Sequence, residues 1–498
     1  MKGVLAFACF SWIVSLFFVP SLAQGPPYKA VNLGAWLVAE GWMTPRLFDG
    51  IPNKDLLDGT QVQLRSTMLN KYVAAENGGG SNLVANRASA SGWETFKLWR
   101  VNETSFNLRV FGNQFVGYQG SSVVAVATTP GPVQTFQIVR NSNDKFRVRL
   151  RASNGRYLQA TSESAVTADY QGNINDWGDQ NPSVFQMTTF GHLQGEYQLT
   201  NGYGPTKAPQ VMKNHWNTYI VEDDFRFLSQ NGINAVRIPV GWWIRYDQSP
   251  PKPFVGGSLQ ALDNAFTWAE KYNMKVIVDL HAVRGSQNGN DHSATRDGSA
   301  TWGDSNIDET VAVIDFLTQR YANRRGLAAM ELMNEPNAQF VPLDTLKTFY
   351  RKGYDAVRKY TANAYVILSN RLGNAPNTEL LDFARQLPKT VIDVHYYNLY
   401  WDQFSSWSPQ QNIDYIYQDR AAKLGELTQP NGNPLTFVGE WVAEFAKGGA
   451  STQDYQNYAK AQQDVYGRAT FGWAYWSYKC QYEHWSLRRM IENGIIKP

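Results

Sequence analysis

The chain has 498 residues, 43% of them hydrophobic, and a formal net charge of only +3. This length exceeds one ordinary compact domain, and the apolar content supports a large core, which excludes a disordered chain. Because the charges are spread without blocks, the sequence gives no electrostatic basis for binding nucleic acid or an anionic membrane. The 17 Trp and 26 Tyr exceed what a core usually requires. Stacking on sugars is one use for this surplus; a large core and ordinary surface tyrosines are the alternative.

Residues 1–23 have the pattern of a signal peptide. Lys2 precedes an apolar stretch at 4–19, and Ser-Leu-Ala at 21–23 fits a small-x-small cleavage site. The stretch is short for a membrane anchor and no other stretch could span a bilayer, so secretion is favoured and no membrane partner is expected. Cys9 would be removed with this segment. Cys480 would then stand alone, without an internal disulfide.

Residues 59–190 have no helical periodicity, and short β-type segments alternate there with Gly, Asn and Ser. Tyr72, Phe115 and Tyr157 stand 43 and 42 residues apart, each after a Leu-Arg strand and before a Phe-rich strand. Three copies of a four-strand unit favour a β-trefoil, because one copy alone could not bury its apolar face. The block resembles the fascin-like trefoil, a fold often used to bind carbohydrate or protein surfaces.

The aromatic residues of this block have two interpretations, contact with polysaccharide or membership of the trefoil core. They are Trp93, Trp99, Tyr118, Tyr157 and Tyr170. The block also contains the N-glycosylation motif of the chain, Asn-Glu-Thr, which makes Asn102 the predicted acceptor.

Strands and helices alternate from about residue 201 to the end. With one strand near the mature N-terminus, eight strands are predicted, at 29–34, 234–240, 275–281, 328–335, 365–370, 391–397, 435–441 and 472–478. Most are continuous apolar runs, typical of parallel strands buried on both faces. Amphipathic stretches between them predict helices at 218–230, 259–272, 309–321 and 343–360.

Eight β/α units predict an α/β fold, the (β/α)8 TIM barrel. Its first strand lies in residues 24–58 and its remainder in residues 191–498. The trefoil at 59–190 is then an insertion between the first strand and its helix, on or beside the C-terminal face of the barrel.

Polar residues and one Trp stand at or near the carboxyl ends of most predicted strands. They are Arg237, His281, Asn334, Glu335, His395, Tyr397, Glu440 and Trp476. A single Glu at a strand end is more often a helix cap or part of a surface ion pair. These ends, however, converge on one rim of a barrel, where buried charges persist only if they pair and act together.

Glu335 and Glu440 fit the chemistry of glycoside hydrolysis. One carboxyl group must donate a proton to the leaving oxygen, and the other must be ionised to attack the anomeric carbon. Strands four and seven lie on opposite sides of the barrel, so the two side chains can face each other across a sugar. Metal catalysis is the alternative. The sequence has no HExxH, clustered Cys/His or dense Asp motif, so no metal and no cofactor is expected.

Three motifs around these residues resemble glycoside hydrolase family 5: Glu331-Leu-Met-Asn-Glu-Pro, Val438-Gly-Glu-Trp and Asp393-Val-His-Tyr-Tyr. Segments 31–40, 215–216, 236–242 and 279–289 resemble its exo-β-1,3-glucanase branch, and a fascin-like domain after strand one resembles a plant subgroup. The resemblance spans the whole barrel. It implies a secreted, retaining β-glycosidase that hydrolyses β-glucans or β-gluco-oligosaccharides by double displacement.

The resemblance also implies roles for the site residues. Glu335 would be the general acid/base and Glu440 the nucleophile. Asn334 would hold the sugar 2-hydroxyl, and Arg237 would keep Glu440 ionised and oriented.

The remaining residues would surround the sugar. Three would contact it at the cleavage site or steer the nucleophile: His281, His395 and Tyr397. Glu40 would bind the far hydroxyls of the non-reducing sugar. Trp476 would form the stacking floor, with Tyr478 as a second candidate because the register of strand eight is open.

Asn290 departs from the fungal exoglucanases, which carry an aromatic residue at this position to clamp the next sugar. Tyr400 would supply the opposite wall. Because Asn290 changes the grip on the acceptor sugar, we expect broader action on short β-glucosides, with transglycosylation. Two alternatives stay open. An endo-acting mannanase or cellulase of the same family is disfavoured by the Glu40 region. A lectin-like protein without catalysis is disfavoured because the costly charged residues are intact.

Overall fold

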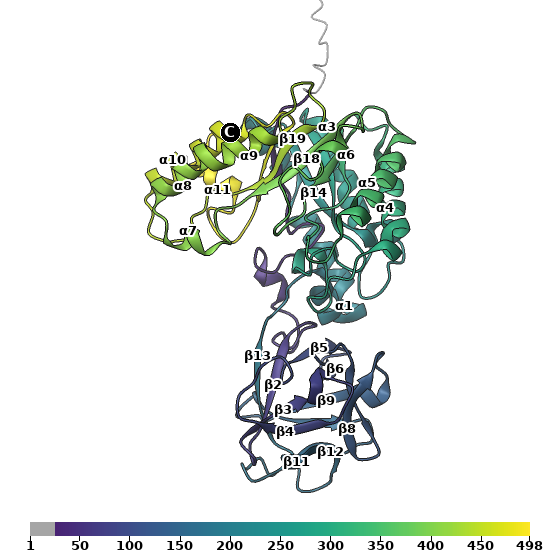
Figure 1. Cartoon of the computed structure of the whole chain (residues 1–498). Coiled ribbons are helices and arrows are strands. Elements are labelled where there is room, and N and C mark those ends of the chain that lie inside the picture. The colour runs from purple at the N-terminus through teal and green to yellow at the C-terminus, as the bar shows by residue number, and fades with distance from the viewer. Residues whose placement is uncertain (1–24) are drawn as a thin grey trace, which may run out of the picture.

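A computed structural model describes residues 25–498, and the predicted signal peptide lies outside them. Figure 1 shows two bodies, a barrel surrounded by helices and a smaller all-β body, which meet at a narrow junction beside α1. Among the helices formed by residues 25–498, none has the length and apolar character needed to cross a membrane.

The larger body is a closed barrel of eight parallel strands, which confirms the predicted TIM-barrel architecture. Strand β1 closes it, because Ala30 pairs with Ala235 on one side and with Ala474 on the other. The strands are β1 (Tyr28–Asn32), β14 (Ala235–Gly241), β15 (Lys275–Ala282), β16 (Leu327–Glu331), β17 (Tyr365–Ser369), β18 (Thr390–Tyr396), β19 (Leu435–Trp441) and β20 (Gly472–Tyr475).

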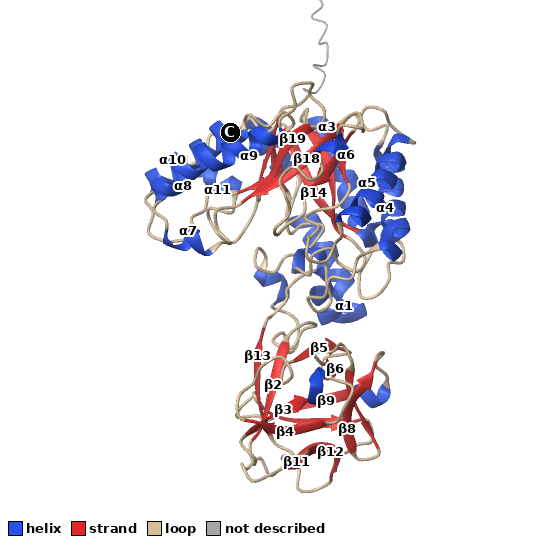
Figure 2. Ribbon diagram, viewed as in Figure 1, coloured by secondary structure: helices blue, strands red, loops and turns tan. Residues whose placement is uncertain are grey.

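Helices cover the outside of the barrel (Figure 2). They are α1 (Glu196–Thr218), α2 (Glu222–Gln230), α3 (Ser258–Lys271), α4 (Ile307–Tyr321), α5 (Leu343–Arg358), α6 (Leu381–Ala384), α7 (Asp402–Ser406), α8 (Pro409–Tyr415), α9 (Ala421–Leu427), α10 (Thr452–Tyr466) and α11 (Leu487–Glu492). Sequence periodicity did not predict α1, which contains Pro205 and Pro209 and is interrupted at Gly204, where φ is +72°.

Two strands are shorter than predicted. Strand β16 ends at Glu331 rather than Glu335, and β20 ends at Tyr475 rather than Tyr478. Glu335 has a φ of +45°, a left-handed conformation that cannot continue a strand.

The smaller body contains twelve antiparallel strands arranged as three similar units of four. Pairs β2–β5, β6–β9 and β10–β13 form within the units, and pairs β5–β6, β9–β10 and β13–β2 join one unit to the next. The strands are β2 (Gln61–Ser66), β3 (Lys71–Ala75), β4 (Leu83–Arg87), β5 (Phe96–Arg100), β6 (Ser105–Arg109), β7 (Phe115–Gln119), β8 (Ser122–Ala127), β9 (Thr135–Arg140), β10 (Arg147–Ala152), β11 (Tyr157–Ser162), β12 (Ala165–Tyr170) and β13 (Phe185–Phe190). This threefold repeat is the β-trefoil that the sequence predicted.

Equivalent residues of the three units form one trefoil core, separate from that of the barrel. Buried at matching positions are Leu64, Leu108 and Leu150, and Phe96, Phe136 and Phe185. The five other aromatic residues lie around this core rather than at its centre: Trp93 is 37% exposed, the other four are partly buried, and Tyr118 packs against the core. Asn102 lies exposed in the turn between β5 and β6.

The trefoil leaves and rejoins the barrel at adjacent points. Gln61 at the start of β2 pairs with Phe190 at the end of β13. The chain then crosses back to the barrel, where Gly195 forms a bridge with Glu40. The insertion therefore begins and ends beside the C-terminal face of the barrel.

Candidate active site

A cavity of about 790 Å³ lies at the carboxyl ends of the barrel strands and contains both predicted carboxylates. Nearly all of the predicted site residues line it or lie directly beneath it. Those that line it are Glu40, His281, Glu335, His395, Tyr397, Glu440 and Trp476. A second hollow of about 900 Å³, beside Arg46 and Arg489, contains neither carboxylate.

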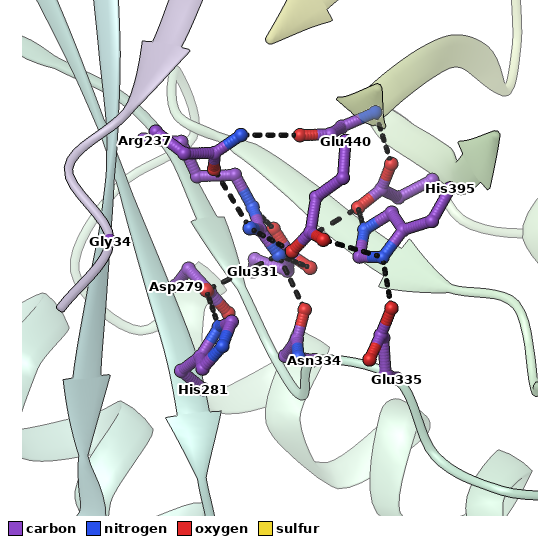
Figure 3. Close-up of polar contacts among 12 residues, drawn as sticks. Gly34, Arg237, Asp279, His281, Glu331, Asn334, Glu335, His395 and Glu440 are labelled. Carbon is purple, nitrogen blue, oxygen red and sulfur yellow. Dashed lines mark hydrogen bonds and ion pairs between the residues drawn. The ribbon is translucent and has the colours of Figure 1, made fainter. Parts of the chain in front are cut away.

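Arg237 forms the buried floor beneath Glu440 (Figure 3). Its Nη1 donates to Glu440 Oε1 at 3.0 Å, and its Nε and Nη2 donate to the two oxygens of Glu331 at 2.6 and 2.8 Å. The hydroxyl of Tyr397 donates to the other oxygen of Glu440 at 2.7 Å. Both oxygens of Glu440 are thereby held in place. Burial raises the pKa of Glu440, while the charges of His395 and Arg237 and the hydrogen bond from Tyr397 act against that rise and favour the ionised form.

His395 stands between the two carboxylates. Its Nδ1 lies 2.7 Å from Glu335 Oε1 and 3.4 Å from Glu440 Oε2, while its Nε2 lies 3.1 Å from Asp393 Oδ2. Ligand atoms of Glu335, His395 and Glu440 all lie within 4.8 Å of one another. A metal ion would accept this spacing too, but Arg237 and Tyr397 already donate to both oxygens of Glu440, and the guanidinium repels a second cation.

His292 also contacts Glu335, and the sequence analysis did not find it. Its Nε2 lies 3.2 Å from Glu335 Oε2, on the loop between β15 and α4. Asn290 is the residue of this loop that the sequence pattern singles out. No periodicity or motif marks a loop residue two positions further on, so proximity in the fold is the signal that identifies it.

The histidines control the protonation of Glu335. Burial favours a neutral Glu335, but the N–H groups and charges of His292 and His395 outweigh burial and hold the pKa of Glu335 well below its usual range. Burial lowers the pKa of His292, yet the hydrogen bond to Glu335 and the charges of Glu335, Glu40 and Asp291 raise it to about 9. One proton is therefore shared across the His292–Glu335 contact, and at rest it lies on the imidazole.

Two buried polar atoms around the cavity, Asn334 Nδ2 and Glu40 Oε1, have no hydrogen-bond partner among residues 25–498. Asn334 Nδ2 is a free donor, since only its Oδ1 is engaged, by Arg237 at 2.8 Å. Glu40 Oε1 is a free acceptor, since only its Oε2 is engaged, by Trp42 Nε1 at 2.9 Å. Unpaired buried groups are costly, so both atoms are suited to bind a hydroxyl-rich ligand.

His281 supports the cavity wall in neutral form. Burial lowers its pKa to about 4, against the effect of Asp279, whose Oδ2 lies 2.6 Å from His281 Nδ1. The ring is nearly parallel to that of Trp476, with centroids 5.5 Å apart. Trp476 lines the cavity, whereas Tyr478 does not: its hydroxyl donates to Asp224 at 2.9 Å, away from the carboxylates. Tyr478 is therefore a wrong candidate for the stacking floor, because strand alternation fails beyond Tyr475.

Aromatic rings form the outer wall of the cavity. Asn290 and Tyr400 both line it, and Tyr400 is 72% exposed. Trp42 and Trp485, which the sequence analysis did not single out, extend this wall and meet edge to face at 4.9 Å. Rings presented to solvent beside a polar cavity suit the apolar faces of sugars.

Comparison with known proteins identifies the barrel. Residues 201–481 match the family described as Cellulase (glycosyl hydrolase family 5), and residues 53–190 match a domain of unknown function, DUF7910. The chain is 31% identical to a glucan 1,3-beta-glucosidase of Pichia angusta over 63% of this chain and 81% of that protein. It is 30% identical to a probable glucan 1,3-beta-glucosidase A of Aspergillus fumigatus over 67% and 89%.

Solved structures agree at the level of fold. Rutinosidase from Aspergillus niger superposes with a TM-score of 0.52 and 20% identity, covering 61% of this chain and 90% of that one. The matching family model spans more than half of the chain, and the closed barrel has two carboxylates facing one cavity. This protein therefore belongs to glycosyl hydrolase family 5.

Proposed function

We propose that the protein is a secreted, retaining β-glucosidase that removes glucose from the ends of β-1,3-glucans and from short β-glucosides. Its relatives named glucan 1,3-beta-glucosidase support the substrate class. Glu40, together with His192 and Leu193 of the segment that returns from the trefoil, lines one side of the cavity, which supports binding of a chain end.

The spacing of the carboxylates is the observation that carries this proposal. One carboxylate oxygen of Glu335 lies within 4.8 Å of one carboxylate oxygen of Glu440. Retaining enzymes place the two carboxyl groups roughly 5 Å apart, whereas inverting enzymes need 6.5 Å or more to admit a water molecule.

In the first step, Glu440 attacks the anomeric carbon and forms a glycosyl ester, while Glu335 gives its proton to the departing glycosidic oxygen. In the second, Glu335 removes a proton from water, the water oxygen attacks the anomeric carbon, and Glu440 leaves as a carboxylate. The free Nδ2 of Asn334 donates to the 2-hydroxyl, the free Oε1 of Glu40 accepts from a distant hydroxyl, and Trp476 stacks on the ring.

Product NMR tests the proposal. Wild type acting on an aryl β-glucoside and on laminari-oligosaccharides is expected to release β-glucose first. The Glu440→Ala variant should lose at least about three orders of magnitude in kcat, because the nucleophile is absent. Azide should then restore turnover and give α-glucosyl azide.

Glu335→Ala is the matched variant. With an activated aryl leaving group it should still form the glycosyl ester, and azide should give the β-glucosyl azide. Release of the α-anomer by wild type, or equal azide products from both variants, would contradict double displacement. Internal cleavage of long glucan or mannan would support the endo-acting alternative, and a folded protein that is inactive on all β-glycosides would support the lectin-like one.

The trefoil is proposed to contact polysaccharide as well. Phe111 and Trp93 are 69% and 37% exposed and lie together over Gly78. Retention of the full chain on insoluble β-glucan, compared with a Trp93→Ala, Phe111→Ala variant, tests this. Equal retention of the two proteins would remove the role.

A further inference from the structure

Side chains of the trefoil bind one loop of the barrel, the segment 283–306 between β15 and α4. The carboxylate of Asp297 on this loop accepts hydrogen bonds from Trp99 Nε1 at 2.7 Å and from Arg109 Nη1 at 2.6 Å. Arg109 also donates to Ser299 at 3.1 Å. The side chain of Asp297 is only 3% exposed, so its charge is desolvated and depends on these trefoil donors.

A second contact reinforces the first. Arg296 donates to Asp58, the residue just before the trefoil, at 2.7 Å, and its guanidinium lies 3.9 Å from the centre of the Trp99 ring. Asp58 is fully buried. Figure 1 shows β5, the strand of Trp99, at the end of the trefoil that faces the barrel.

The opposite side of the same loop forms the wall of the active site. His292 contacts Glu335, and Asn290 and Asp291 line the cavity. The two sides of the loop touch: a side chain at Gly289 would lie 2.7 Å from the carbonyl oxygen of Gly298. Because this backbone is closely packed, a shift of Asp297 would displace the part of the loop that carries His292.

The trefoil repeat is asymmetric where it meets this loop. Trp99 occupies a position that is Val139 in the second unit and Thr188 in the third. Arg109 has equivalents in Arg65 and Arg151, but these lie within the trefoil: Arg65 is over the ring of Tyr72, and Arg151 donates to Gly155. Trp99 is therefore not a requirement of the trefoil repeat, and Arg109 differs from its two equivalents in that its guanidinium contacts the barrel loop.

We propose that Trp99 and Arg109 are positioning residues for glycoside hydrolysis, acting through Asp297 to hold His292 against Glu335. The inserted domain is then a structural part of the active site. This inference rests on the proposed function of Glu335 as acid/base.

The test compares Arg109→Leu with Arg65→Leu and Arg151→Leu, which remove the equivalent side chain from the other units. In the full chain, Arg109→Leu should lower kcat/KM by about tenfold, because sub-ångström displacement of a catalytic group is costly. It should also move the basic limb of the pH profile in the direction produced by His292→Asn. The two control variants should keep the kcat/KM and pH profile of wild type. Arg109→Lys, which preserves the charge, should recover part of the activity.

A double-mutant cycle separates positioning from general stability. In a His292→Asn background, Arg109→Leu should have little further effect. Additive effects, an unshifted pH profile, or equal losses in all three Arg→Leu variants would overturn the inference.

Hydrogen exchange gives a reading independent of activity. Amides of 286–299 should lose protection in Arg109→Leu and in Trp99→Phe, but not in Arg65→Leu. Unchanged protection would overturn the inference even if the enzyme acted on another glycoside or by inversion. Lost protection in a protein without glycosidase activity would instead overturn only the proposed function.

Discussion

His292 is influenced by two carboxyl groups with different proposed roles: Glu335 as the acid/base and Glu40 as a binder of a sugar hydroxyl. Its Nε2 is 3.2 Å from Glu335, and the charge of Glu40 also acts on it. In many glycosidases burial alone gives the general acid a higher pKa than the nucleophile, so that the acid keeps its proton. Here the pKa shifts favour the proton on an imidazole one hydrogen bond away from Glu335, and in the proposed reaction substrate binding would move it across that contact.

The basic limb of the pH profile of kcat/KM reports this shared proton. With His292 present, the pair retains it up to a pH of about 9. In His292→Asn the imidazole that holds the proton is absent, and His395 still keeps the pKa of Glu335 low, so the limb should move to lower pH. His484→Asn is the control, because His484 pairs with Glu444 at 3.0 Å elsewhere. An unmoved limb in His292→Asn would contradict the shared proton.

At this scale the sequence predicted both carboxylates and their partners Arg237, His395 and Tyr397, but it did not predict His292. Glu335 and Glu440 follow from strand positions, because the carboxyl ends of parallel strands converge whatever the loops do. His292 reaches Glu335 only through the path of a loop that packs on an inserted domain. Tyr478 failed for a related reason, since alternation along β20 stops at Tyr475.

At the scale of elements, the segment that returns from the trefoil lies between Glu40 and the loop of His292. Gly195 bridges Glu40, and Gly41 N donates to Gln194 O at 2.7 Å. A side chain at Gly195 would stand 2.2 Å from the carbonyl oxygen of Asp291. The segment and the loop of His292 are therefore in backbone contact.

Gly195→Ala should separate the two segments and lower kcat/KM by about tenfold or more, because both Glu40 and His292 would move. Gly303→Ala is the control on the same loop, since a side chain there meets no atom within 4 Å. Steady-state kinetics and thermal unfolding of both variants provide the measurement. Wild-type kinetics in Gly195→Ala would show that the two segments can separate without any effect on kcat/KM.

Elements with a strong repeat were predictable, and those shaped by contact were not. The barrel strands are apolar runs and the trefoil has a threefold sequence motif, so both can be predicted from the local sequence. Helix α1 contains Pro205, Pro209 and a positive φ at Gly204, features that argue against a helix until packing against the barrel supports it.

At the scale of the whole molecule, buried ionisable groups make stability depend on pH. Burial raises the pKa values of Glu40 and Glu196 to about 8, so the folded chain holds these protons where the unfolded chain has lost them. Burial lowers those of His215 and His281 to about 4, which has the opposite effect. Between about pH 5 and 6.5 the two pairs offset each other.

Above pH 6.5 His215 and His281 no longer contribute, and the free energy of unfolding should fall as pH rises toward 8. Each raised carboxyl contributes roughly 1.4 kcal/mol per pH unit to this fall. Glu196→Gln should therefore unfold at a higher temperature than wild type at pH 8 and at nearly the same temperature at pH 5. Glu163→Gln, with a side chain 55% exposed, should change neither. A Glu196→Gln effect that is independent of pH would contradict this account.

The adjacent ends of the trefoil also bear on how the barrel closes. Ala30 must find Ala235 across the whole insertion. Once β2 and β13 are paired, however, the insertion spans no more distance than a hairpin turn. The effective loop shrinks from about 200 residues to about 80, which lowers its closure entropy cost by about 1 kcal/mol. A domain whose two ends lie side by side can therefore be inserted into a barrel loop, or replaced by another such domain, with little added entropy cost for the pairing of β1 with β14.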